Sequence, residues 1–451
     1  MSITRRPVGA PAPGHGIGEL DNGILDGRQL EADHTDDLPV DDDEGTRGAP
    51  GGPGPGRPWQ AAFWRPARDQ LLRPQTVVTL AVVAACVVFT FVQLQPSQLF
   101  RNTTPAGGDM GAHVWLPDYV KRALLPHGRI TGWTPDWYAG FPALTYYFPL
   151  PIVSIAILSY VIPYDIAFKL VSVAGLVTLP VAAWAFGRLA RLPFPSPACL
   201  ALASVGYLFS RDFTIYGGNI ASTMAGEFSF SISLSLALLF LGVTARGLHT
   251  GRLRALAAVL LACTAFCHIL PAIFAVGGAG VLWVLRPSAR RLLWIAPVMV
   301  VAGCLAAFWA LPFYVRLPYA TNMGYQKLTA YLPSLFPSKD VWLFVLAGIG
   351  ILLSLMRRRR IGAWLSIMTV LAAVVFRFAP QARLWNARVL PFWFLCLHLL
   401  VGVALAELGT LLAEAFVSTR NRAAALVPIP VVALLIALVW VGFPLRILPF
   451  G

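Results

Sequence analysis

The chain has 451 residues, of which 57% are hydrophobic and 12% are charged, and its formal net charge is +14. A soluble domain carries about 25% charged residues, so this composition excludes a soluble globular protein. The basic residues cluster at the ends of apolar runs, as they do in cytoplasmic loops of membrane proteins. The positive charge therefore does not indicate nucleic acid as a partner.

The first 58 residues differ in composition from the rest. They are rich in Gly, Pro and Asp and hold 11 of the 21 acidic residues, with "DDLPVDDDEG" at their centre. Such a segment cannot bury enough apolar surface to order itself, so we predict a disordered cytoplasmic tail at 1–58. The membrane domain is predicted at 59–451, and arginines before its first apolar run place the N-terminus in the cytoplasm.

Apolar runs follow one another through the rest of the chain, and several reach roughly 18 to 20 residues, enough to cross a bilayer as a helix. They predict an all-α polytopic protein of the plasma membrane with about 11–13 transmembrane helices. The runs lie near 76–95, 143–162, 166–187, 197–210, 228–245, 255–269, 271–286, 292–311, 341–356, 362–379, 389–411 and 424–445.

Three basic stretches, "RGLHTGRLR", "RPSARR" and "RRRR", are predicted to be cytoplasmic. The loops predicted outside then include 96–142, 211–227 and 312–340. Counting every run as a full span puts 211–227 inside, so one segment within 143–210 does not cross. We expect this to be the short run 197–210, which follows three prolines, and the same count places Asp165 near the inner end.

Asp109 follows a Gly-Gly pair and precedes the amphipathic stretch "AHVWLPDYVKRALLPHG". The stretch predicts a helix lying in the outer membrane interface. At its start Asp109 is either an N-cap or a carboxylate held at the lip of a cavity as a general base. His113, on the same helix, is a candidate substrate contact.

The next stretch, "RITGWTPDWYAGFPALTYYFPLP", gathers aromatic residues around an acid. An interfacial aromatic belt explains the rings. A carbohydrate platform also explains them, since sugar C–H faces pack on aromatic rings, and the two interpretations are compatible. The candidate substrate contacts here are Asp136, Trp137 and Tyr138.

A third polar stretch is either a polar loop or a second wall of the same cavity. "YGGNIASTMAGEFSF" carries Asn219 and Glu227 ahead of a span, where an acid is also favoured by the helix dipole. His268 lies at an outward turn, where it is either a helix-end residue or a substrate contact.

Positive charge recurs on the predicted outer side in "RFAPQARLWNARVLPFW". Arg383 and Arg388 are candidates for a clamp on a lipid-linked phosphate, with Asn386 beside them, because a guanidinium fork matches phosphate geometry. Interfacial snorkelling of the arginines is the alternative. The chain ends shortly after a span, at "FPLRILPFG", so we expect a longer parent protein with an extracytoplasmic C-terminal domain.

The order of these pieces resembles the GT-C glycosyltransferases: a first span, an outer loop with an early aspartate and interfacial helices, then many spans and a later outer loop. "GDMGAHVW", "GWTPDWYAGFPALTYYFPLP" and "RLWNARVLPFWFLC" are similar to an actinobacterial family labelled "6-pyruvoyl-tetrahydropterin synthase-related, membrane domain", over roughly residues 76–451. The GT-C resemblance implies inverting transfer from a polyprenyl-phosphate sugar with the early acid, Asp109, as base. Some members use a divalent metal, so a metal stays an alternative here, but the first loop has no Asp-x-Asp or adjacent acid pair to support it and no metal ligand is assigned.

The predicted function is an integral membrane glycosyltransferase that modifies a cell-envelope glycan or lipid on the outer face. Its partners would be the bilayer, a polyprenyl-phosphate-linked sugar and a glycan or lipid acceptor. The alternative is a non-enzymatic transporter, a flippase or an envelope-assembly scaffold, including an inactive GT-C relative. Transporters tend to place polar residues at mid-membrane on broken helices, whereas the acids here are predicted at the outer face.

Overall fold

The structure is a computed structural model that describes residues 73–321, 324–380 and 384–441. The predicted tail at 1–58 and the candidate Arg383 lie outside the described residues.

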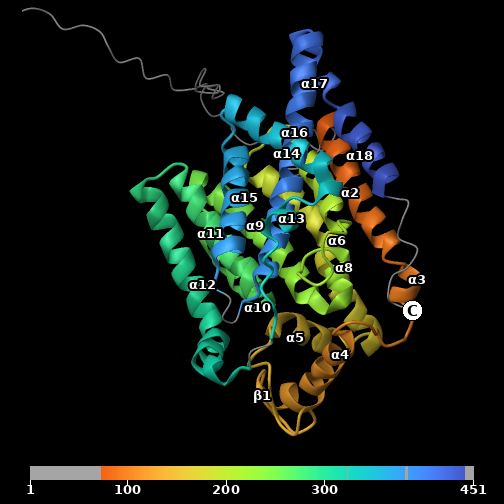
Figure 1. Cartoon of the computed structure of the whole chain (residues 1–451), viewed down its shortest axis with the longest axis vertical. Coiled ribbons are helices and arrows are strands. Elements are labelled where there is room, and N and C mark those ends of the chain that lie inside the picture. The colour runs from red at the N-terminus through yellow and green to blue at the C-terminus, as the bar shows by residue number, and fades with distance from the viewer. Residues whose placement is uncertain (1–72, 322–323, 381–383, 442–451) are drawn as a thin grey trace, which may run out of the picture. The chain divides into compact units, whose positions relative to one another are not determined.

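Each of the apolar runs predicted from the sequence coincides with a helix (Figure 1). These helices are α2 (Pro74–Gln93), α5 (Pro149–Leu158), α6 (Tyr164–Leu189), α7 (Ser196–Leu208), α9 (Phe228–Thr250), α10 (Arg254–Cys267), α11 (Ile269–Val284), α12 (Ala289–Arg316), α14 (Val341–Met356), α15 (Arg360–Phe378), α16 (Leu390–Phe416) and α18 (Pro428–Val441).

Shorter elements fill the connections. They are α3 (Pro96–Leu99), α4 (Met110–Tyr119), η1 (Val120–Leu124), η2 (Leu125–His127), β1 (Gly132–Thr134), β2 (Phe141–Ala143), α8 (Ile220–Ser222), η3 (Thr223–Glu227), η4 (Leu317–Tyr319), α13 (Tyr331–Leu335), η5 (Ser338–Asp340), η6 (Asn386–Val389), η7 (Thr419–Asn421) and α17 (Arg422–Ala425).

Within the described residues, eight helical segments are long and apolar enough to cross a membrane. α5, α7, α10 and α11 are apolar but have only 10 to 17 residues. A bilayer leaves no water for exposed backbone groups, so helices satisfy them internally. The chain is a multi-pass helical membrane protein.

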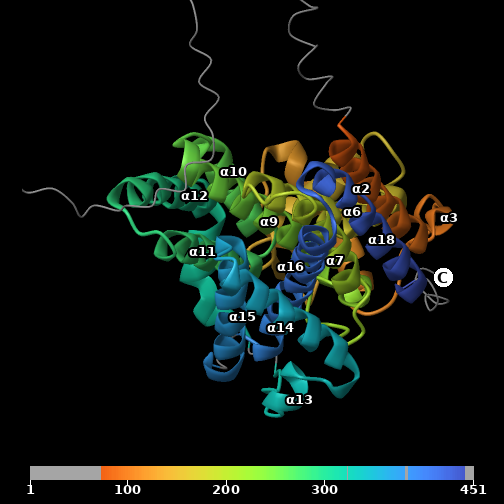
Figure 2. The same cartoon turned by 90° about the horizontal axis from the view of Figure 1, so that it is seen from above.

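α9 and α16 form the centre of the bundle. The apolar windows of the segments that contain them are 83% and 94% buried, against 22% for α2 and 11% for the segment that contains α18. Seen from above, they lie between α10–α12 on one side and α2 and α18 on the other (Figure 2). The apolar outer faces of the peripheral helices are the surface available to lipid.

Small residues bring the central helices close together. A Cβ on Gly175 of α6 would lie 2.6 Å from the Ser231 carbonyl oxygen of α9, and one on Gly402 of α16 would lie 2.8 Å from the Cys199 oxygen of α7. Helix pairs in membranes use such small residues because lipid provides no hydrophobic force to drive them together.

At one end of the bundle, the loops between helices are rich in arginine, and we call it the arginine-rich end. Trp294 Nε1 donates to the Arg252 carbonyl oxygen at 3.1 Å, which joins the first turns of α12, just after "RPSARR", to the stretch "RGLHTGRLR". The His249 side chain also interacts electrostatically with Arg191 and Arg360, so the two loops that carry these arginines lie at the same end. This end comprises residues 189–196, 246–254, 285–291, 357–360 and 417–422.

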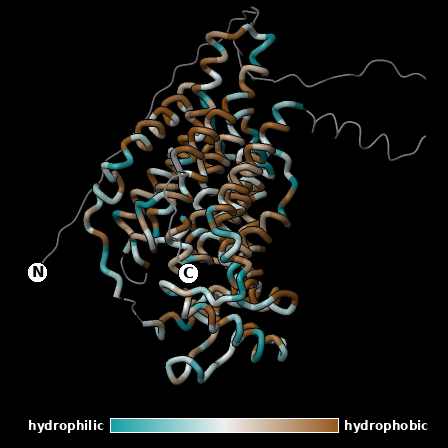
Figure 3. The backbone as a smooth tube through the Cα atoms, turned by 90° about the vertical axis from the view of Figure 1, so that its right-hand side faces the viewer, coloured by the Kyte–Doolittle hydropathy of each residue, from teal (hydrophilic) through white to brown (hydrophobic). Residues whose placement is uncertain are grey.

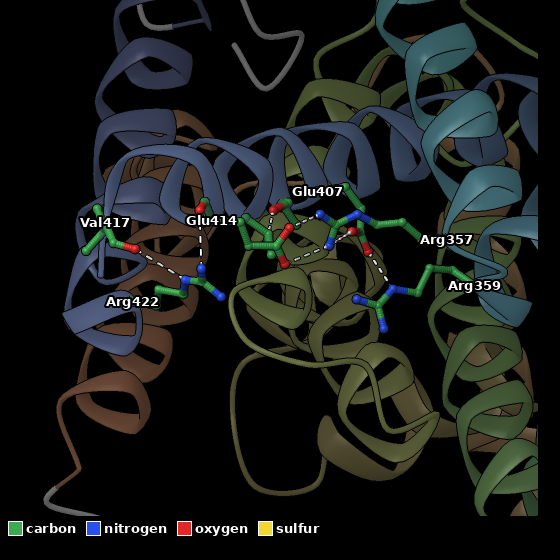
Figure 4. A network of polar contacts seen from close by, with 8 residues as sticks. Arg357, Arg359, Glu407, Glu414, Val417 and Arg422 are labelled. Carbon is green, nitrogen blue, oxygen red and sulfur yellow. Dashed lines mark hydrogen bonds and ion pairs between the residues drawn. The ribbon is translucent and has the colours of Figure 1, made fainter. Parts of the chain in front are cut away.

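An ion-pair network ties the α14–α15 turn to α16 at this end (Figure 4). Arg359 Nε lies 2.9 Å from Glu407, whose side chain is 5% exposed, and Arg357 Nη1 lies 3.4 Å from the same carboxylate. Arg357 also pairs with Glu414, whose carbonyl oxygen accepts from Arg422. A buried carboxylate is tolerated because both guanidinium groups compensate its charge.

The opposite end, here the loop end, comprises residues 94–148, 159–165, 209–227, 317–321, 324–340 and 384–389. It is more hydrophilic than the bundle (Figure 3). After α4, the strands β1 and β2 pair antiparallel with Trp133 opposite Pro142, a hairpin that the sequence did not predict.

Both ends of α5 lie at the loop end, and this corrects the predicted topology. The ring of Phe148, just before α5, contacts that of His268 in the α10–α11 turn, and Lys121 Nζ donates to the Ser159 carbonyl oxygen, just after α5, at 2.9 Å. Ten residues span about 15 Å, half of a hydrocarbon core of about 30 Å. The segment that does not cross is therefore α5.

α7, within the run 197–210 that was expected not to cross, connects the two ends. It begins after Arg191 at the arginine-rich end and ends before Asp212, which pairs with Lys339 at the loop end. Asp165 is also corrected: it accepts from Thr104 at 3.0 Å and lies at the loop end, because α6 runs in the opposite direction to the one predicted.

Candidate functional site

Asp109 is carried on a turn packed against the segment before α9. Gly107 and Gly108 have φ values of 97° and 52°, and the Asp109 amide donates to the Ala225 carbonyl oxygen at 2.8 Å. A Cβ on Gly108 would lie 2.8 Å from the Ala225 Cα. Glycine is required here both for the left-handed backbone and for the close approach, which explains the Gly-Gly pair.

The Asp109 side chain does not act as a helix cap. Asp109 occupies the N-cap position of α4 and is exposed, yet its carboxylate accepts no hydrogen bond from the amides of the first turn. Its stem lies against Gly226, where an added Cβ would be 2.8 Å from the Asp109 Cβ. The carboxylate remains available for another partner.

A neutral polar pair lies beside Asp109. His113 Nε2 is 3.4 Å from the Tyr147 hydroxyl, which is 3.3 Å from Ser229 Oγ. Burial lowers the pKa of His113 to about 4, against the opposing charge of Asp109. Burial likewise raises the pKa of Tyr147, so both groups are uncharged near neutral pH.

Glu227 and Arg388 join the early and late parts of the chain through an ion pair. Glu227 ends η3, Arg388 lies in η6, and each side chain is 16% exposed. Together with Asp109, both charges act on the Tyr147 hydroxyl. These residues, Asp109, His113, Tyr147, Glu227 and Arg388, form what we call the loop-end cluster.

A cavity of about 1180 Å³ adjoins the cluster at Arg388. It lies between the β1–β2 hairpin, the start of α11 and the end of α12. Arg388 and His268 line it, whereas Asp109, His113 and Glu227 are not among its lining residues. The lining side chains with rings are Trp133, Phe141, Tyr146, Phe148, His268, Phe313, Tyr319, Tyr325 and Trp385.

His268 forms part of the cavity wall while capping α11. Its Nδ1 accepts from the Leu270 amide at 3.2 Å, and its ring lies 4.3 Å from Phe148 and 5.0 Å from Phe230, centroid to centroid. The extended backbone at His268 separates α10 from α11. The predicted helix-end role of His268 is therefore seen, and its predicted contact with a substrate stays a prediction for a side chain that lines the cavity.

The two asparagines have structural positions. Asn219 is fully buried, caps α8 through the Ser222 amide and donates to the carbonyl oxygens of Ser210 and Phe213. Asn386 is also buried, and its amide group exchanges hydrogen bonds with the Leu328 backbone at 3.1 and 3.0 Å. Each holds a loop in place, so we do not include either in the proposed site.

The residues around Asp136 form a separate surface. Trp137 stacks on Trp115 with 5.4 Å between centroids, and Tyr138 is 87% exposed. The Asp136 side chain is exposed as well. Their neighbour Trp133 lines the cavity instead, so the hairpin divides the predicted aromatic platform into a cavity part and an outer part.

Several cavity residues were not singled out from the sequence. Arg316 ends α12, and its carbonyl oxygen accepts from the Tyr146 hydroxyl at 2.8 Å. Tyr325 stacks on Trp385 with 4.7 Å between centroids. Arg316 carries the same signal as Arg388, a basic residue at the predicted outer end of a span, and could have been found in that way.

The described residues contain no group of three or more His, Cys, Asp or Glu side chains arranged to hold a metal ion. We therefore derive no step through a metal. The chemistry that the site offers is that of a carboxylate base, guanidinium groups and aromatic rings.

The fold is similar to that of a known membrane enzyme. Two cryo-EM structures of the arabinofuranosyltransferase AftD from mycobacteria, one of them a mutant, superpose with TM-scores of 0.54 and 0.55 at 17% sequence identity. The match covers 81% of this chain but 26% and 28% of those chains, so this chain spans about a quarter of their length.

This likeness confirms the predicted GT-C-like fold. No family model matches the chain, and no curated protein matches it. The narrower resemblance to the family labelled "6-pyruvoyl-tetrahydropterin synthase-related, membrane domain" stays a prediction.

Proposed function

We propose that this protein is a membrane glycosyltransferase that moves a sugar from a polyprenyl-phosphate donor to a glycan or lipid acceptor of the cell envelope. The observation that carries the proposal is the exposed Asp109, which precedes α4 without capping it and belongs to the same loop-end cluster as Arg388. The GT-C-like fold supports the reaction class. Since the two similar structures reported above are of an arabinofuranosyltransferase, an arabinofuranosyl donor is the first to test.

In the proposed reaction, an acceptor hydroxyl attacks the anomeric carbon and its proton passes to Asp109. The bond from that carbon to the phosphate oxygen breaks, and the polyprenyl phosphate leaves with the bonding electrons. Cationic groups lower the energy of the charge that develops on the leaving oxygen, often the largest single contribution to catalysis. Arg388 lines the cavity and pairs with Glu227, so it connects the proposed base with the cavity.

We place this chemistry on the outer face. The arginine-rich end lies at the other end of the bundle, and loops rich in Lys and Arg stay in the cytoplasm. The loop end then faces outward, where cell-envelope acceptors are located.

The alternative of a transporter gains little support from the buried charges. Lys169 lies near the loop end, where its Nζ donates to the carbonyl oxygens of Gln98 at 2.7 Å and Arg101 at 2.5 Å. Glu407 is paired with arginines at the arginine-rich end. In the described part of the chain, both buried charges are thus used to hold the ends of helices.

The proposal is tested by Asp109→Asn, assayed for sugar transfer in membrane vesicles supplied with polyprenyl-phosphate arabinose. A positioned base contributes about 10²–10⁴-fold, so we expect transfer to fall by at least about 100-fold with insertion unchanged. Asp118→Asn is the matched control, because Asp118 is on the same helix and pairs at the surface with Arg122. Transfer at the wild-type rate by Asp109→Asn would disprove the role of Asp109.

A further inference from the structure

We propose that the cavity at the loop end binds the phosphate-bearing head of a lipid-linked donor, and that Arg316 is the residue that contacts its phosphate. The inference rests on the proposed function and deepens it, since it assigns the donor to a place in the molecule. It also gives a role to a residue that the sequence did not single out.

The positive charge of the cavity wall favours an anionic ligand. Arg316 and Arg388 line the cavity, and none of the described residues that line it is acidic. Arg388 is already paired with Glu227. Arg316 is exposed, and no ion pair joins it to an acid of the described chain. Arg316 is therefore the cation better able to accept a new negative charge.

The start of α11 adds to this positive field. His268, Ile269 and Leu270 all line the cavity, and they form the N-terminal end of a 16-residue helix. The macrodipole of a helix is equivalent to roughly half a positive charge at this end, which favours anions. The helix end alone would not define a site, but here it faces the same cavity as Arg316.

Aromatic rings supply surfaces for a sugar. Trp133 is 66% exposed, and Tyr146 lies 6.4 Å from Phe313, centroid to centroid, across the two walls. Ligand pockets typically have volumes of about 300–1,000 Å³, so a cavity of about 1180 Å³ has room for a glycosyl phosphate. The combination of rings and cations fits a phosphorylated sugar better than a neutral glycan.

The position of Arg316 at the end of α12 fits a lipid-linked ligand. Leu311, Tyr314 and Val315 precede it and are 60%, 72% and 69% exposed, on a helix long and apolar enough to cross the membrane. A polyprenyl tail could lie along this apolar surface while its phosphate reaches Arg316 at the polar boundary. Snorkelling of Arg316 to the interface is the competing explanation, and the experiment separates the two.

The experiment measures binding rather than transfer. The full chain in phosphatidylcholine nanodiscs is titrated with decaprenyl phosphate and, separately, with decaprenol, which lacks the phosphate. We expect wild-type protein to prefer decaprenyl phosphate, and Arg316→Gln to weaken its binding by about 10-fold or more, as loss of a charge-assisted hydrogen bond does. Arg316→Lys should retain part of the affinity, because it keeps the charge but loses the fork. Arg129→Gln, an exposed loop-end arginine that does not line the cavity, is the matched control.

Unchanged binding in Arg316→Gln, or an equal loss in Arg129→Gln, would overturn the inference and favour snorkelling. Equal binding of decaprenol and decaprenyl phosphate by wild-type protein would overturn it as well. The thermal unfolding of each variant checks its fold. Because binding needs no transfer, an active Asp109→Asn variant would refute the proposed base and leave the Arg316 result standing.

Discussion

Single residues at the loop end show why a residue type does not reveal its role. Asp109 and Asn219 both occupy N-cap positions, yet the Asn219 side chain caps its helix and the Asp109 side chain does not. For Asp109 the sequence was consistent with both a cap and an exposed carboxylate, whereas for Asn219 it suggested a place in the wall of a cavity. The difference arises from the neighbours, because Asn219 is enclosed by the loop it holds and Asp109 projects from a glycine turn.

We predict that the single residue His113 makes the stability of the folded protein depend on pH. Its pKa is about 4 in the folded protein and about 6.5 in an unfolded chain, so the unfolded state binds the proton first as the pH falls. Stability should therefore decrease from pH 6.5 to pH 4, by on the order of 3 kcal/mol at most.

The measurement is the thermal unfolding temperature in detergent at pH 7 and pH 4.5. His113→Gln should show a smaller decrease between the two pH values than wild-type protein, whereas His127→Gln, which removes an exposed histidine, should not differ from it. Identical pH profiles for wild type and His113→Gln would contradict the assignment.

Among the elements, the α6–α9 contact positions the site, since α9 begins directly after Glu227. Gly175 allows this contact, because a Cβ there would meet the backbone of Ser231 and Ile232. We expect Gly175→Ala to cost about 1–3 kcal/mol of stability, as overpacking does. Gly303→Ala, on the exposed face of α12 with open space around it, is the control and should leave the unfolding temperature unchanged or higher. Equal effects at both positions would argue against close packing at Gly175.

For the whole molecule, α5 determines which loops share a side of the membrane, because the segments before and after a helix that does not cross lie on the same side. If α5 crossed, residue 161 would lie on the opposite side from residue 129. We expect Val161→Cys and Arg129→Cys, in a background without the native cysteines, to react with an impermeant maleimide from the same side, and Arg290→Cys to react from the other. Labelling of Val161→Cys together with Arg290→Cys would contradict the topology. In intact cells, labelling of Arg290→Cys alone would instead reverse the proposed outer face.

The sequence by itself determined the helices. Runs such as 76–95 and 389–411 are apolar over the thickness of a bilayer, and a helix satisfies their backbone groups without help from distant residues. It also singled out Asp109, Glu227 and Arg388 as candidate site residues from the scarcity or unusual placement of their charges. These features are local, so they can be seen in the chain alone.

Only the tertiary structure decided which residues share a site. The Glu227–Arg388 pair, the division of the aromatic residues between cavity and outer surface, and the place of Arg316 in the cavity wall all join segments far apart in the chain. The failure of α5 to cross was decided in the same way, by contacts at both of its ends. Hydrophobic periodicity reports which face of a helix is apolar but not which neighbour covers it, and that choice depends on packing between distant segments.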